Sequence, residues 1–189
     1  EPQLTPDVHA ALLIRSHGFV GAAGLSEALS AAAVRRGAIV RAPARAECIA
    51  RSGGSIEIQL GDGRVTARHV VLAAGSWSGQ IAIEGVPPLP VRPVRGQLLR
   101  LAWDGPALNR IVWAPRCYLV PAGARAVLVG ATVEDAGFDE RATVAGVRDL
   151  LEGACGLVPH FRQASFEGAR VGLRPATADE MPIIGRSAK

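Results

Sequence analysis

The chain has 189 residues, of which 49% are hydrophobic and 20% charged, and its formal net charge is +4. This composition is typical of a globular protein, and no apolar run reaches the ~18 residues that a membrane-spanning helix needs. The basic charges are scattered arginines, without the stacking aromatic residues of a nucleic-acid-binding face. The three cysteines are widely spaced and form no metal-binding pattern with the histidines. We therefore expect a cytoplasmic protein that binds no membrane, nucleic acid or metal.

The chain begins with an α/β pattern. Residues 24–37 form the clearest helical repeat, with Leu25 and Leu29 on one apolar face. Gly37 stands where a helix often ends in a left-handed residue. An apolar pair at 39–40 then predicts a short buried strand, which is the close helix-to-strand step of a doubly wound sheet.

An antiparallel meander and a central strand are predicted next. Strands at 46–50 and 55–60 precede an Asp-Gly turn, after which the chain returns at 65–75. This last segment contains the apolar run 70–74, which is typical of a strand buried on both faces. It ends in Ala-Ala-Gly at Gly75, and ligands of open α/β sheets bind outside such strand ends. A glycine that only turns the chain would give the same pattern.

The second half predicts an α+β unit. Four prolines between residues 85 and 96 indicate an extended crossing into this unit. A helix is expected at 143–155, capped by Thr143, with Val144 and Leu150 facing inward. The strands of a mixed or antiparallel sheet are expected at 97–102, 111–113, 117–121, 126–132 and 166–175. The predicted fold class is therefore α/β plus α+β.

One arginine has the pattern of a ligand-binding residue. Arg174 ends an apolar strand beside Pro175, where a guanidinium can hold a carboxylate through two hydrogen bonds. A structural salt bridge to a loop acid explains the pattern equally well. The paired acids at 134–135 and 139–140 are expected to be solvated loop residues. The stretch "GSWSG" at 75–79 places a tryptophan where a nucleophile elbow needs serine, so no catalytic residue is assigned.

Several blocks together resemble a known family. They include "VVLAAGSWSG" (70–79), "CYLVP" (117–121), "VLVGATVEDAGFD" (127–139) and "GLRPATADEMPIIG" (172–185). In this order they resemble the D-amino-acid oxidase-like FAD-dependent oxidoreductases, and within them the glycine oxidases of thiamine biosynthesis. The likeness covers nearly all of the chain. It implies that the chain is an internal piece of a longer enzyme, inactive alone, because the family's G-x-G-x-x-G strand and a C-terminal FAD-contacting segment are absent.

The resemblance implies a Rossmann-like FAD-binding domain at 17–80 and 175–189, joined to a substrate-binding domain at 1–16 and 81–174. It implies oxidative deamination of glycine or another small amino acid, with hydride transfer to the flavin and reoxidation by oxygen. An amino-acid dehydrogenase or a sarcosine-type oxidase of the same fold is one alternative. A non-catalytic fragment that binds a carboxylate or a partner is another. The resemblance also allows a homo-oligomer.

The family motifs assign roles to individual residues. Arg174 matches the arginine that binds the substrate carboxylate, and Tyr118 matches a tyrosine on the substrate side of the flavin. Four further positions match residues that face the cofactor FAD: Ala46, Ala74, Gly75 and Trp77.

Overall fold

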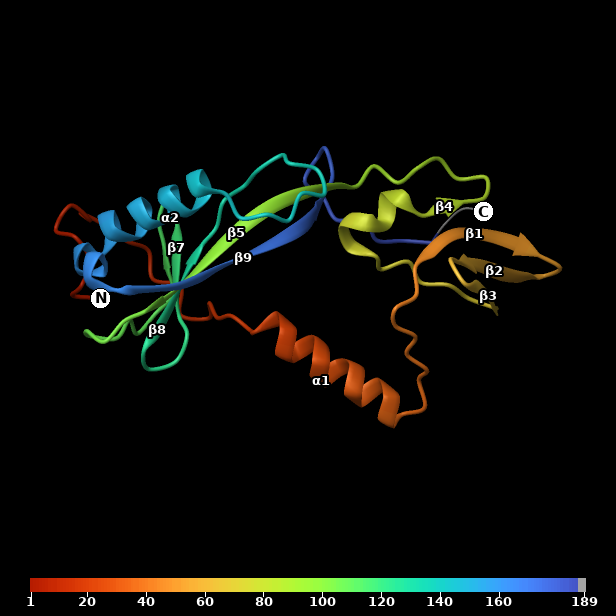
Figure 1. The fold of residues 1–189 in the computed structure, drawn as a ribbon, viewed down its shortest axis with the longest axis horizontal. Helices are drawn as coiled ribbons and strands as arrows, with labels where there is room; N and C mark the ends of the chain where they lie inside the picture. The colour runs from red at the N-terminus through yellow and green to blue at the C-terminus, as the bar shows by residue number, and fades with distance from the viewer. Residues whose placement is uncertain (187–189) are drawn as a thin grey trace. The chain divides into compact units, whose positions relative to one another are not determined.

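The computed structural model describes residues 1–186, which form two compact units (Figure 1). One unit, the five-stranded unit, comprises Glu1–His17 and Arg92–Glu180. The other, the four-stranded unit, comprises Gly18–Val91 and, within the described chain, residues 181–186.

The predicted domain limits differ from these units at three places. Residues 81–91 lie with the four-stranded unit, whereas His17 and residues 175–180 lie with the five-stranded unit. The end of the predicted range 175–189, residues 187–189, is outside the described part of the chain.

The five-stranded unit is built on one antiparallel sheet in the order β6-β7-β8-β5-β9. Its strands are β5 (Arg92–Ala102), β6 (Val112–Trp113), β7 (Tyr118–Pro121), β8 (Ala126–Gly130) and β9 (Ser165–Ala176). The two longest strands, β5 and β9, pair from one end to the other. The sheet and its strands confirm the predicted α+β unit.

A helical layer covers one face of this sheet (Figure 1). It consists of α2 (Val144–Leu157) and the 3-10 helix η2 (Pro159–Gln163), and it encloses a core around Leu99 and Leu119. As predicted, Thr143 caps the start of α2, and its hydroxyl oxygen accepts a hydrogen bond from the Gly146 N–H at 3.1 Å. The inward prediction is right for Leu150 but wrong for Val144, which is 88% exposed. Val144 lies off the stripe formed by the buried residues of α2, which are Gly146, Leu150, Gly153 and Ala154.

The four-stranded unit contains the predicted meander, in the order β3-β2-β1-β4. Its strands are β1 (Ala46–Ser52), β2 (Ser55–Leu60), β3 (Gly63–Ala67) and β4 (Ala82–Ile83). Only β4 runs parallel to its neighbour, β1, among the pairs that the structure describes. The predicted helix is α1 (Ala22–Arg35), and Gly37 follows it with a left-handed φ of 92°.

Two strands predicted for this unit are not observed, and the predicted apolar face of its helix is exposed. Residues 39–40 and 70–74 form no strand, and Val71 is 89% exposed. A strand requires hydrogen-bonded neighbours, and no other segment within residues 1–186 pairs with either stretch. Leu25 and Leu29, the predicted inward residues of α1, are exposed because no described element covers that face of the helix.

Candidate functional site

Arg174 lies near the end of β9, where its guanidinium rests against the backbone of β5. Its Nη1 donates a hydrogen bond to the Thr132 carbonyl oxygen at 3.1 Å. A side chain at Gly96 of β5 would collide with this guanidinium, so only glycine leaves the space that it occupies. Arg174 forms no ion pair with any acid in residues 1–186. The salt-bridge explanation of this arginine therefore has no support in the described chain.

Tyr118 lies over a second glycine of the same sheet. It is directly opposite Gly130 in the β7–β8 pairing, and a side chain at Gly130 would collide with the tyrosine ring. Trp113 of β6 is opposite Tyr118 on the other side, with ring centroids 4.8 Å apart. An aromatic pair thus borders the space above the two glycines.

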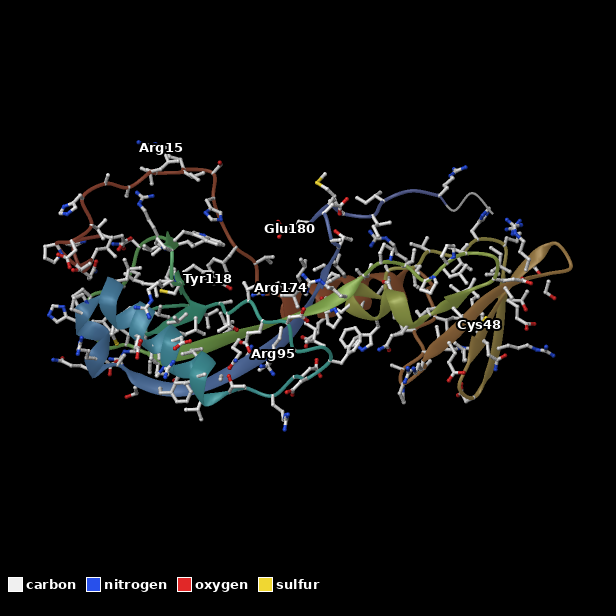
Figure 2. All side chains as sticks on the ribbon, turned by 90° about the horizontal axis from the view of Figure 1, so that it is seen from above. Arg15, Cys48, Arg95, Tyr118, Arg174 and Glu180 are labelled. Atoms are coloured by element: carbon white, nitrogen blue, oxygen red, sulfur yellow. The ribbon has the colours of Figure 1, made fainter. Side chains whose placement is uncertain are left out.

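Strand register places Arg174 and Tyr118 on the same face of the sheet. Arg174 is opposite Val94, and Gly130 is opposite Leu98, which stands four residues after Val94 on β5. Residues directly opposite in antiparallel strands share a face, and alternate residues of one strand do so too. This arginine–tyrosine face is the one that α2 leaves uncovered, since the core residue Leu99 points to the other side. Figure 2 labels Arg174 and Tyr118 in this unit.

Behind this face lies a polar cluster that sequence reasoning missed. Glu134, which we expected to be a solvated loop acid, accepts a hydrogen bond of 2.9 Å from Nε of the buried Arg95. Burial acts to raise the pKa of Glu134, but hydrogen bonds with Thr132, Arg95 and Gln97 outweigh it, so the pKa is lowered. The alternation of Arg95 and Gln97 within an apolar strand was the available signal, because buried polar groups need partners.

Asp139, expected to be a solvated acid as well, faces two arginines. It accepts hydrogen bonds from the Arg141 side chain and main chain at 2.8 and 3.0 Å, and these hold its pKa far below the ordinary range. The Arg95 Nη1 atom lies 3.1 Å from an Asp139 carboxylate oxygen and adds to this effect.

A separate pocket of about 620 Å³ lies within the four-stranded unit. It is lined by Ala44, Arg45, Ala46, Glu47, Ala74, Trp77, Gln80 and Ile81. Three of the four predicted cofactor-facing residues, Ala46, Ala74 and Trp77, are thereby brought together. The fourth, Gly75, follows Ala74 with a left-handed φ of 55° and begins the 3-10 helix η1 (Gly75–Gln80).

The lining of this pocket suits a flat ligand, and it carries one charge of each sign, on Arg45 and Glu47. Its alanines leave the backbone accessible, and Trp77 offers a half-exposed ring. Arg45 brings a positive charge, and its Nη2 lies 3.5 Å from the Gln80 side-chain oxygen. The volume is within the ~300–1,000 Å³ of small-molecule sites. In the described chain, no group of three His, Cys, Asp or Glu side chains is placed to hold a metal ion.

A family model described as "DAO: FAD dependent oxidoreductase" matches residues 1–189. The chain belongs to this family. A bifunctional protein ThiO/ThiG from Nostoc sp. is 38% identical over 141 residues, which are 72% of this chain and 21% of that protein. The crystal structure of a glycine oxidase from Geobacillus kaustophilus matches with a TM-score of 0.95 and 32% identity, over 100% of this chain and 51% of that one.

A second solved structure, an iminodiacetate oxidase from Chelativorans sp., is also 32% identical to this chain. It has a TM-score of 0.79 and covers 87% of this chain and 45% of its own. The predicted family, fold class and FAD requirement are thus confirmed. The chain spans about half the length of the glycine oxidases that it matches. Among residues 1–186, no helix is long and apolar enough to cross a membrane.

Proposed function

We propose that the protein containing this chain oxidises the amine of glycine or a closely related small amino acid, and that Arg174 binds the substrate carboxylate. The observation that carries this proposal is a guanidinium without an acidic partner in the described chain, set over Gly96 on the same sheet face as Tyr118. A planar guanidinium can pair with both oxygens of a carboxylate. The glycine oxidase relatives and the ThiO/ThiG relative support the substrate class and a role in thiamine biosynthesis.

The five-stranded unit is then the substrate-binding part and the four-stranded unit part of the FAD-binding region. The pocket with Ala46, Ala74 and Trp77, beside Gly75, holds part of the cofactor, since its small side chains admit a flat ring to the backbone. When bound, FAD supplies the acceptor for the two electrons that leave the substrate C–N unit.

The residues of this chain contribute by binding and orienting the substrate. Arg174 fixes the carboxylate, and the Tyr118 hydroxyl donates a further hydrogen bond to it. Holding the carboxylate restricts the positions of the neighbouring Cα and amine. The free energy of binding thereby orients the substrate for the reaction. No side chain of this face has to take up a proton from the amine if the substrate binds with a neutral amine.

The test is Arg174→Ala in the complete, FAD-loaded protein. We expect KM for glycine to rise by about 100-fold, since a charged pair of hydrogen bonds contributes about 3 kcal/mol, while FAD absorbance stays unchanged. Arg125→Ala is the matched control, because it removes the same charge from an exposed arginine that pairs only with Asp104 in the described chain. An unchanged KM for Arg174→Ala, with FAD bound, would overturn the carboxylate role.

An oxidase for N-substituted glycines is the second candidate. It is favoured by the iminodiacetate oxidase, which is as similar in sequence to this chain as the glycine oxidase structure. Comparing kcat/KM for glycine, sarcosine and iminodiacetate separates the two, because a primary-amine enzyme prefers glycine. Replacing oxygen by an artificial electron acceptor then distinguishes an oxidase from a dehydrogenase.

A further inference from the structure

Thr132 connects the two faces of the sheet. It lies just beyond the end of β8, and its carbonyl oxygen accepts the 3.1 Å hydrogen bond from Arg174 on the arginine–tyrosine face. Its hydroxyl oxygen accepts a hydrogen bond from the Gln97 main-chain N–H at 2.8 Å, and its own N–H donates to the Gln97 carbonyl at 3.3 Å. One residue therefore carries the contact with Arg174 and is itself held to β5 by two bonds.

Gln97 is the centre of the cluster behind Thr132, and it is completely buried. Its Nε2 donates to a carboxylate oxygen of Glu134 at 2.7 Å and to the Thr143 hydroxyl at 2.9 Å. Its side-chain oxygen accepts from the Thr143 N–H at 2.9 Å. A side chain at Gly146 of α2 would collide with this amide. Both amide N–H groups and the oxygen are thus satisfied, which fixes the rotamer of Gln97.

Arg95 completes the cluster on the same side of β5. Its guanidinium binds the second carboxylate oxygen of Glu134, and the main chains of the two residues exchange two hydrogen bonds of 2.9 Å. Hydrogen bonds to β5 therefore hold the loop from Thr132 to Thr143 at its first residue, at Glu134 and at its last residue. Figure 2 labels Arg95 and Arg174, which come from the neighbouring strands β5 and β9.

We infer that Thr132 is a positioning residue for Arg174, and that the cluster of Arg95, Gln97, Glu134 and Thr143 holds it rigidly for this purpose. The inference rests on the proposed carboxylate-binding role of Arg174. An exposed arginine has many rotamers, and ordering them on binding lowers affinity. A fixed carbonyl that already holds Nη1 removes part of this cost and leaves the remaining N–H groups for a carboxylate.

Thr132→Val tests this role in the complete, FAD-loaded protein. The substitution keeps the shape of the side chain but leaves the buried Gln97 N–H without its acceptor, which loosens the segment that holds Arg174. We expect KM for glycine, and Ki for the simple carboxylate glycolate, to rise roughly 3- to 10-fold, with kcat and FAD content unchanged. Thr132→Ser keeps the hydroxyl and is expected to restore both constants.

The double variant with Arg174→Ala separates positioning from general damage. If Thr132 acts through Arg174, Thr132→Val adds nothing to KM in the Arg174→Ala background. An equal added effect in both backgrounds, or a Thr132→Val protein with unchanged KM and Ki, overturns the inference while the proposed function stands. An Arg174→Ala protein with unchanged KM overturns the proposed function instead. Should Thr132→Val fail to fold, Thr132→Ala removes the same hydroxyl and is judged by the same measurements.

Discussion

The two units differ in how far their apolar residues are buried. The five-stranded unit encloses a core between its sheet and α2, with Leu99 and Leu119 fully buried. In the four-stranded unit, Leu60 is the one apolar residue that is buried within the described part of the chain, while Leu29 and Val71 are exposed. Both units carry apolar helix and strand patterns in the sequence. An apolar pattern thus identifies the face of an element that could be buried, but not whether another element covers it.

The first prediction, with the largest expected effect, compares the truncation of one leucine in each unit of the 189-residue chain. Leu99→Ala leaves a cavity in the closed core and is expected to lower the free energy of unfolding by about 2–5 kcal/mol. Leu29→Ala changes a side chain that is 61% exposed on α1, so its effect should stay below about 0.5 kcal/mol. Urea unfolding followed by circular dichroism measures both. Similar losses for the two variants would show that α1 is covered in solution.

Local patterns explain which elements were predicted correctly. The strands β1 to β3, the strands of the five-stranded sheet, the N-cap of α2 at Thr143 and the left-handed Gly37 after α1 follow from residues close together in the chain. The two-residue strand β4 was not predicted. The strand expected at 70–74 is wrong because a strand depends on a neighbour, and a sequence window contains no information about one.

The candidate site shows the same limit. Arg174 and Tyr118 were identified from family motifs, whereas the two glycines beneath them were not, because only strand register brings them together. The pair of Arg95 and Glu134 was missed for a similar reason, since 39 residues separate its members in the chain. The roles of Arg174 and Tyr118 in substrate binding stay predictions, and Arg174→Ala addresses the first of them.

The next effect in size concerns the pair of Glu134 and the buried Arg95 in the five-stranded unit. Because the folded state lowers the pKa of Glu134 below its ordinary value of 4.5, its stabilising contribution is complete above pH 4.5 and is lost as the pH falls below it. Glu134→Gln cannot ionise and should lower the free energy of unfolding by about 1–3 kcal/mol near neutral pH. The difference in the free energy of unfolding between the parent and Glu134→Gln should become smaller as the solution is acidified below pH 4.5.

Urea unfolding across this pH range is the measurement, and Glu152→Gln is its control. Glu152 forms an exposed pair with Arg116 at 3.3 Å, and such pairs contribute less than about 1 kcal/mol. If the stability curves of the parent and Glu134→Gln stay parallel down to acidic pH, the carboxylate is not the group that stabilises the loop.

The smallest effect concerns the backbone beside the pocket of the four-stranded unit. Gly75 and Gly53 share a φ of 55°, and at neither would a Cβ meet another atom within 4 Å. Alanine at either position should therefore lower the free energy of unfolding by about 1 kcal/mol, because alanine disfavours a left-handed backbone. Only Gly75→Ala should also weaken FAD binding in the complete protein, by about fivefold, because Gly75 adjoins the pocket and Gly53 lies in the β1–β2 turn. Asparagine tolerates this backbone better, so Gly75→Asn should recover most of the affinity in a flavin titration. Equal FAD affinities for the two alanine variants would remove Gly75 from the cofactor site and leave it as a residue that only turns the chain.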